Sequence, residues 1–261
     1  MIPETVIPRR HTEQHLSWGF RMRSLLRICA TVLTVCVVVT GMLQSPAALA
    51  ETIAIIGTDD VANALGPQFA ALGHKVVYGS RNPDRDKVRQ LVKRTGKNAA
   101  ATGQAEAAAG ADIVVLAVPW DVIEEVVSNL GDLSGKIIID PTNPRAVEED
   151  GLRWYPREIS NAELLQKLAP GAFVVKAFNT MSASTMAEPS MAGGPVSVPL
   201  VGNDAPAKQT VAELVAGMGL EPVDLGPVRY ARIVEGMYYL RSNARVFGHS
   251  FNFHLRRQPE P

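Results

Sequence analysis

Cysteine is nearly absent from this sequence of 261 residues, and the only two, Cys29 and Cys36, lie in its first 50 positions. If that segment is removed, a disulfide framework, a thiolate nucleophile and a cysteine-ligated zinc or iron–sulfur centre are all excluded. None of the five histidines has the spacing of a metal motif such as H-E-x-x-H. The chain also has no net charge, because its 26 basic and 26 acidic side chains cancel. With no Lys/Arg-rich run, we expect no nucleic-acid partner.

The residues up to Ala50 have the layout of a secretory signal peptide. Arg23 and Arg27 make a basic region, residues 28–43 are an uncharged apolar run, and an A-x-A cleavage motif ends at Ala50. We therefore expect cleavage after Ala50 and a periplasmic or secreted protein. The alternative is an uncleaved signal that anchors the chain in a membrane, although the run is short for a full span. Whether translation starts at the first or the second methionine stays open.

Beyond this segment, strand-like apolar runs alternate with amphipathic helical segments. The predicted strands are 52–57, 75–80, 111–119, 136–140, 172–178, 196–202 and part of 221–226, with at most a short strand and helix in 98–110. The predicted helices are 61–72, 83–94, 122–130, 162–168, 205–218 and a last one from Arg229 on. Such alternation with short links predicts an α/β fold: a Rossmann-type, doubly wound, mostly parallel sheet with helices on both faces.

The chain shows no internal repeat or linker, so we expect three segments. Residues 1–50 are the signal peptide and the segment before it, 51–240 form one nucleotide-binding domain, and 241–261 are a C-terminal tail. The tail is rich in Phe, His and Arg. It closes the ligand cleft, packs on a second subunit in a homodimer, or is a disordered end.

The first strand leads into a turn that resembles a dinucleotide-binding turn. That turn has the pattern G-x-G-x-x-G, in which Gly57 is the first glycine and Ala62 a tolerated third position. Asp59 replaces the second glycine and brings a side chain and a negative charge to the pyrophosphate position. Either Asp59 points outward and caps the following helix, or the nucleotide site is degraded.

The end of the second strand indicates which dinucleotide is bound. An NAD site has an acidic residue here that holds the ribose 2′-hydroxyl, whereas this chain has Ser80 and Arg81, with Arg85 nearby. A guanidinium binds a phosphate bidentately, so these residues favour NADP(H) over NAD. The alternative is a solvated helix start, although the helix dipole disfavours arginine there unless an anion is present.

Two further polar residues follow a strand at the ligand-binding edge. Lys176 and Asn179 are candidates for contact with a substrate or second cofactor; the alternative is a local ion pair and a turn-capping amide. No Ser-His-Asp set or carboxylate pair is evident. Hydride transfer needs none, because the cofactors carry the chemistry. The catalytic residue therefore stays unassigned.

Five segments together resemble a known family, over about residues 51–240. They are IAIIGTDDVANALGPQFAALGHKVVYGSRNP (53–83), VVLAVPWD (114–121), DPTNP (140–144), VVKAFNT (174–180) and DLGPVRYARIVEG (224–236). They resemble the NADP oxidoreductases that depend on the deazaflavin coenzyme F420. They are also similar to the cytosolic oxidoreductase domain of six-transmembrane metalloreductases.

The resemblance implies an enzyme that transfers hydride between NADP(H) and a second redox compound, and it suggests F420 as that compound. A flavin or a metal chelate are the alternatives. It implies that the pyrophosphate is lined by Thr58, Asp60, Val61 and Ala62. The 2′-phosphate would be held by Ser80, Arg81 and Arg85, and the ribose and nicotinamide would be covered by Ala117, Val118 and Pro119, with Asn143 nearby. The alternative is a non-catalytic nucleotide-binding domain, which Asp59 and the export signal favour.

Overall fold

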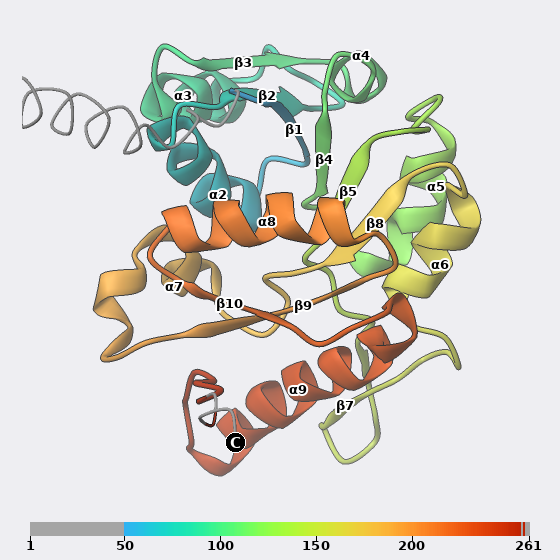
Figure 1. Ribbon diagram of the computed structural model, residues 1–261, viewed down its shortest axis with the longest axis vertical. Helices are drawn as coiled ribbons and strands as arrows, with labels where there is room; N and C mark the ends of the chain where they lie inside the picture. Colours follow the sequence, from blue (N-terminus) through green and yellow to red (C-terminus); the bar gives the residue numbers. More distant parts are fainter. Residues whose placement is uncertain (1–49, 257, 259–261) are drawn as a thin grey trace, which may run out of the picture. The chain divides into compact units, whose positions relative to one another are not determined.

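The computed structural model describes residues 50–256 and 258, so the predicted signal peptide lies outside the described residues except for Ala50. These residues belong to one compact unit built on an eight-stranded sheet of order β10-β9-β8-β5-β4-β1-β2-β3 (Figure 1). The strands of this sheet are β1 (Thr52–Ile56), β2 (Lys75–Gly79), β3 (Ala99–Thr102), β4 (Ile113–Leu116), β5 (Ile137–Asp140), β8 (Phe173–Lys176), β9 (Ser197–Gly202) and β10 (Glu221–Asp224). All neighbours pair parallel except β8 and β9. The predicted Rossmann-type class is confirmed.

Helices cover both faces of the sheet. The main helices are α2 (Asp60–Ala71), α3 (Asp86–Thr95), α4 (Gln104–Ala109), α5 (Ile123–Ser128), α6 (Asn161–Leu168), α7 (Ala183–Ala187), α8 (Ala205–Gly217) and α9 (Ala231–Ala244). Buried side chains of α2, α3, α7 and α8 join one core, and those of α4, α5, α6 and α9 join the other. No helix within residues 50–256 is long and apolar enough to cross a bilayer.

The two cores follow from the side-chain period of the strands. In β1, Ile53 and Ile55 enter one core while Ala54 and Ile56 enter the other, and all four are completely buried. Successive side chains of a strand point to opposite faces, so a strand covered on both sides is apolar throughout. The continuous apolar runs of the sequence therefore became the central strands.

Three features of the fold were not predicted, and helix α7 is one of them. A hairpin of β6 (Ala146–Val147) and β7 (Arg153–Trp154) follows β5, and β9 runs antiparallel to β8. A continuous buried run looks the same in a parallel and an antiparallel strand, so the sequence pattern carries no sign of the reversal. The helix predicted from residue 83 begins only at Asp86, because Arg85 is still extended with φ −67° and ψ 149°.

The C-terminal segment is part of the same unit. The predicted boundary after residue 240 falls inside α9, which continues to Ala244. Beyond it the chain returns to the start of β9, where Ser197 N donates to the Phe253 carbonyl and Ser197 Oγ accepts from Leu255 N, both at 2.8 Å. The described part of the tail is thus hydrogen-bonded to the first residue of β9, the strand next to the edge of the sheet.

Candidate active site

The candidate site lies where the strand order of the sheet reverses. The strands on one side of β1 are β2 and β3, and on the other side β4 and β5, so the carboxyl ends of β1 and β4 flank the switch point. In open α/β sheets, ligands bind in the crevice at this point. The turn after β1 and the loop after β4 are therefore the elements that shape the site.

Gly57 brings these two elements into contact. It has φ +113°, and a Cβ built on it would lie 2.1 Å from the carbonyl oxygen of Ala117. Its N–H donates to the Gly79 carbonyl at the end of β2, at 3.0 Å. A side chain at this position is excluded by both conformation and space. The first glycine of the predicted turn is thus required by the fold itself.

The turn leads directly into the N-terminus of α2. The first helical hydrogen bond runs from Asn63 N to the Asp59 carbonyl at 2.8 Å, and no side chain caps this end. The N–H groups of Asp60, Val61 and Ala62 come before that bond, so they have no partner within the helix. Uncapped N–H groups and the positive end of the helix dipole together bind phosphate. Thr58 and Ala62 are buried, so a ligand here would meet main chain more than side chain.

Asp59 occupies the N-cap position but does not cap the helix. Its carboxylate forms an ion pair with Lys87 of α3, with 2.5 Å between Oδ1 and Nζ, and its side chain is 73% exposed. The hypothesis that Asp59 points outward agrees with this geometry, whereas the predicted capping bond is wrong. A carboxylate can cap only if it accepts from the first-turn N–H groups, and here it pairs with the Lys87 ammonium instead.

The loop after β2 places basic residues beside the turn. Arg85 Nη2 donates to Thr58 Oγ1 at 2.9 Å, so this guanidinium bridges the two loops. Ser80 is buried, and its Oγ accepts from Asn82 N at 3.2 Å. Arg81 is exposed next to it. The three residues predicted to bind a 2′-phosphate therefore lie on one loop, and Arg85 also reaches Thr58 in the turn after β1.

The opposite wall is made by the loop after β4. Ala117 and Val118 are half-buried, and Pro119 is exposed just before a short 3₁₀ turn, Trp120–Val122. Asn143 follows β5 and exchanges amide hydrogen bonds with Asn179. Its Nδ2 donates to the Asn179 carbonyl and its Oδ1 accepts from Asn179 Nδ2, both at 2.9 Å. The structure thus brings one predicted cofactor residue and one predicted substrate residue into direct contact.

The segment before Asn179 has an unusual backbone. Phe178 has φ 63°, in the left-handed region that bulky residues avoid. Asn179 Oδ1 and Thr180 Oγ1 are buried without a hydrogen-bond partner among the described residues. Strain and unsatisfied polar atoms of this kind gather at functional sites. The carboxyl end of β8 therefore belongs to the candidate site.

Lys176 forms a local ion pair, which was the alternative interpretation of this residue in the sequence. Its ammonium is completely buried between Asp140 Oδ2 at 2.9 Å and Glu235 Oε1 at 2.6 Å, and it also donates to the Thr142 carbonyl. All its protons have partners, so direct contact with a substrate, the other prediction, does not fit this geometry. The ion pair instead joins β5, β8 and α9 beneath the Asn143–Asn179 pair.

Burial and charge set the protonation of this cluster. Burial raises the pKa of Glu235 to about 7; the Lys176 ammonium opposes the rise and the Asp140 carboxylate adds to it. The pKa of Lys176 is raised, because the two carboxylates outweigh the effect of burial. The sequence pattern did not identify Asp140 and Glu235 as members of a buried cluster. A signal existed for Glu235, since it lies beside Val234 and four positions after Ala231, on the buried face of the helix.

We expect Asp59→Gly to raise the affinity for NADPH about tenfold. The change removes a Cβ and a negative charge from the turn and frees Lys87. At an effective dielectric constant near 20, two unit charges about 5 Å apart repel by roughly 3 kcal/mol. Solvent and salt reduce this to about 1–2 kcal/mol at so exposed a turn, which is about a tenfold change. Fluorescence titration with NADPH measures it.

The matched control for Asp59→Gly is Asp86→Asn, which removes an exposed carboxylate from α3 that pairs with Arg89. NADPH affinity should not change in this variant. Lys87→Met should weaken binding more in the Asp59→Gly background than in the original chain. An affinity that Asp59→Gly leaves unchanged would show that this carboxylate stays away from the nucleotide.

Several known proteins are similar to this chain in sequence and in fold. The family model for coenzyme F420-dependent NADP oxidoreductases matches residues 52–144. The F420-dependent NADP reductase of Methanothermobacter thermautotrophicus is 31% identical over 209 residues, which cover 74% of this chain and 89% of that protein. A candidate F420-dependent NADP reductase from Arthrobacter sp. FB24 has a crystal structure that matches with a TM-score of 0.72 and 32% identity, over 80% of this chain and 100% of that one.

A second kind of relative is larger. Metalloreductase STEAP3 of Rattus norvegicus is 35% identical over 192 residues, which are 72% of this chain and 36% of that protein. The chain thus spans about a third of the length of the metalloreductases it matches. The similarity covers nearly the whole Methanothermobacter thermautotrophicus reductase. The glycine turn at the switch point and the mostly parallel sheet agree with it. This chain belongs to the coenzyme F420-dependent NADP oxidoreductase family.

Proposed function

We propose that the chain is an NADP(H)-dependent reductase whose dinucleotide lies across the carboxyl ends of β1, β2 and β4. The observation that carries this proposal is the uncapped N-terminus of α2, which follows a glycine packed against the β4 loop. The residues fit the cofactor: main-chain N–H groups face the pyrophosphate position, and no side chain of the turn caps them. Bound NADPH would supply a hydride to a second redox compound.

The loop after β2 would select the phosphorylated cofactor. Arg81 and Arg85 are cations next to the turn, and Ser80 offers a hydroxyl. No acidic residue takes the place that in NAD sites binds the ribose 2′-hydroxyl. The charges of this loop therefore suit a 2′-phosphate.

We expect Arg81→Ala to weaken NADPH binding by roughly 1.5–3 kcal/mol, since a charge-assisted pair with the phosphate is lost. NADH binding should barely change. Titration of both nucleotides followed by fluorescence measures the two affinities. Arg89→Ala is the control, because Arg89 is an exposed arginine of α3 that pairs with Asp86. Equal losses for NADPH and NADH would mean that Arg81 does not read the 2′-phosphate.

The second compound would bind beside the Asn143–Asn179 pair, at the carboxyl ends of β5 and β8 on the β4 side of the switch point. A deazaflavin such as F420 is the class that the shared family favours, and a flavin is the other candidate that can accept a hydride. A ferric chelate takes one electron at a time, so two ferric ions would be reduced per NADPH, through a flavin that first accepts the hydride. The protein's part is to orient the two rings and exclude water, because no general acid or base is needed for hydride transfer.

The test is direct. The purified chain is titrated with NADPH, and NADPH oxidation is then followed by absorbance with F420, FMN or a ferric chelate as acceptor. Turnover with one acceptor supports the proposal and identifies the class. NADPH binding without turnover would favour the second candidate, a non-catalytic nucleotide-binding domain, for which the Asp59 carboxylate at the turn is the supporting observation. No NADPH binding at millimolar concentration would overturn both.

We also propose that the protein is exported and processed after Ala50. The support is the basic, apolar and A-x-A layout of residues 22–50 and the start of β1 only two residues later. N-terminal sequencing of protein from its native fraction should read Glu51 first. An intact leader in the membrane fraction would favour the anchored alternative.

A further inference from the structure

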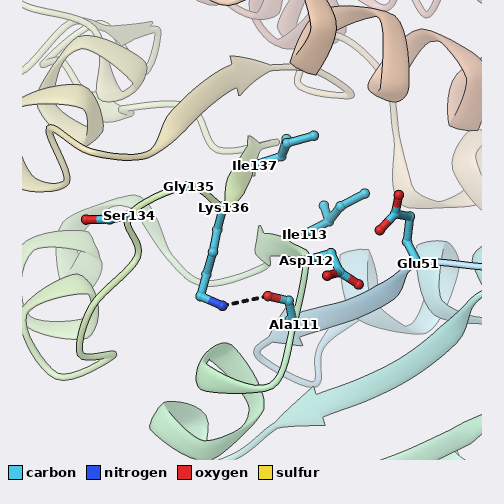
Figure 2. Close-up of a pocket in the computed structure, with 8 residues that line it drawn as sticks. All are labelled: Glu51, Ala111, Asp112, Ile113, Ser134, Gly135, Lys136 and Ile137. Carbon is cyan, nitrogen blue, oxygen red and sulfur yellow. Dashed lines mark hydrogen bonds between the residues drawn. The ribbon is translucent and has the colours of Figure 1, made fainter.

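A cavity of about 320 Å³ opens at the amino ends of β1, β4 and β5, on the edge of the sheet opposite the candidate active site. Figure 2 shows Glu51 and Asp112 with their carboxylates on one side of it, while the Lys136 side chain reaches the Ala111 carbonyl. Each of these three residues lies at or just before the start of a strand. The cavity is therefore shaped by the starts of three neighbouring strands.

The two carboxylates lie close together without a cation between them. Asp112 Oδ2 accepts from Thr52 N at 2.8 Å, which fixes this carboxylate beside the start of β1. The pKa of Glu51 is raised by burial and by the charge and hydrogen bonding of Asp112. Lys136 Nζ instead donates to the carbonyls of Ala111 at 2.7 Å and Ala109 at 3.1 Å. The nearest ammonium of the cavity is thus occupied by main-chain oxygens.

The main-chain nitrogen of Glu51 is held at the same place. It donates to His74 Nδ1 at 3.2 Å, and the Glu51 carbonyl accepts from Lys75 N at 3.0 Å. Burial lowers the pKa of His74, which favours the neutral ring that can accept this bond. The Glu51 nitrogen is therefore ordered one residue before the N–H that binds Asp112.

We propose that the α-ammonium group of a processed Glu51 is the counter-ion of this carboxylate pair, so that cleavage after Ala50 completes a partly exposed ion-pair site. The proposal rests on the processing proposed above. A peptidase adds water across the Ala50–Glu51 amide, which leaves the Ala50 carboxylate on the released leader and an amine on Glu51 that takes a proton at neutral pH. One N–H would keep the bond to His74, and the others would face Asp112 and the Glu51 side chain.

The α-ammonium of Glu51 should stabilise the folded protein only within a defined pH range. An α-amino group ionises near pH 7.7–8.0 in an unfolded chain. Two carboxylates would raise its pKa in the folded state, so its contribution is complete below about pH 7.7 and disappears as the pH rises through the higher folded value. It also needs ionised carboxylates and so fades in acid. The other titratable groups at this end are His74, whose pKa is lowered by burial, the exposed Lys75, and Lys136, whose ammonium donates to the Ala111 carbonyl.

The experiment uses the full chain with a protease recognition sequence that ends immediately before Glu51. The melting temperature is measured before and after cleavage at pH 7 and pH 10. We expect cleavage to raise the Tm by about 2–4 °C at pH 7, the scale of a partly exposed ion pair in a domain of this size, and to leave it unchanged at pH 10.

Two matched controls isolate the new charge. Moving the recognition sequence four residues upstream removes the same leader but keeps the amine away from the cavity, so it should give no gain. Asp112→Asn keeps an oxygen for Thr52 N while removing the charge, and it should reduce the gain by half or more. An equal Tm rise in either control, or no rise at pH 7, would overturn the proposal. Because the added protease creates the terminus, the result is independent of where the cell cleaves and of reductase activity.

Discussion

Lys176→Met should destabilise the protein by about 3–5 kcal/mol at pH 8, the largest stability loss we expect from a single polar side chain here. The substitution keeps the size of the side chain and removes its ammonium. It leaves the carboxylates of Asp140 and Glu235 buried next to each other without a cation. Urea denaturation followed by circular dichroism measures the free energy of unfolding.

The same variant should show a steeper pH dependence. The folded pKa of Glu235, about 7, lies above its ordinary value of 4.5, so the folded state binds more protons between these values and its stability falls as the pH rises through them. Without the Lys176 ammonium this pKa rises further. The loss in Lys176→Met should therefore be smaller at pH 5 than at pH 8.

Glu235→Gln is the control for this cluster. It retains an acceptor for Lys176 and for Asn161 N, and it removes the group that titrates near pH 7. We expect a flatter stability profile between pH 5 and 8. The double variant Lys176→Met/Glu235→Gln should recover part of the loss. A Lys176→Met protein as stable as the original at pH 8 would contradict the ion-pair role of this lysine.

The second large effect is expected at the turn, where Gly57→Ala should cost about 3–4 kcal/mol of stability and lower NADPH affinity at least tenfold. A left-handed backbone strains an alanine by about 1–3 kcal/mol. The new Cβ would also overlap the Ala117 carbonyl oxygen, at 2.1 Å, and overpacking of this kind costs about 1–3 kcal/mol. The shift needed to relieve it separates the two loops that would hold the nucleotide.

Gly73→Ala separates strain from overlap. Gly73 also has a positive φ, +97°, but a Cβ there would meet nothing within 4 Å. We expect a loss of about 1 kcal/mol, the strain alone, and no change in NADPH affinity. Thermal denaturation and nucleotide titration of both variants make the comparison. Similar losses for Gly57→Ala and Gly73→Ala would show that the contact with Ala117 carries no energetic weight.

The sequence determined the parts of this protein that depend on neighbouring residues. Buried strands need apolar runs and covering helices need amphipathic ones, so the order of elements and the Rossmann-type class could be predicted from periodicity. Gly57 before a helix, with Ser80 and Arg81 after the next strand, located the candidate nucleotide site for the same reason. A turn and its helix are encoded within a few positions.

Only the tertiary structure decided which distant residues meet. Asp59 finds Lys87 rather than the end of its own helix, and Lys176 finds Glu235, a residue 59 positions away. Periodicity shows that a side chain is buried or exposed, but the partner of a buried charge depends on which strands and helices are neighbours in space. The antiparallel pairing of β9 with β8 and the packing of α9 against α6, β7 and β9 set those neighbours. The turn after β1 in the candidate site is therefore encoded locally. The buried cluster of Lys176, Asp140 and Glu235 forms only once the chain has folded.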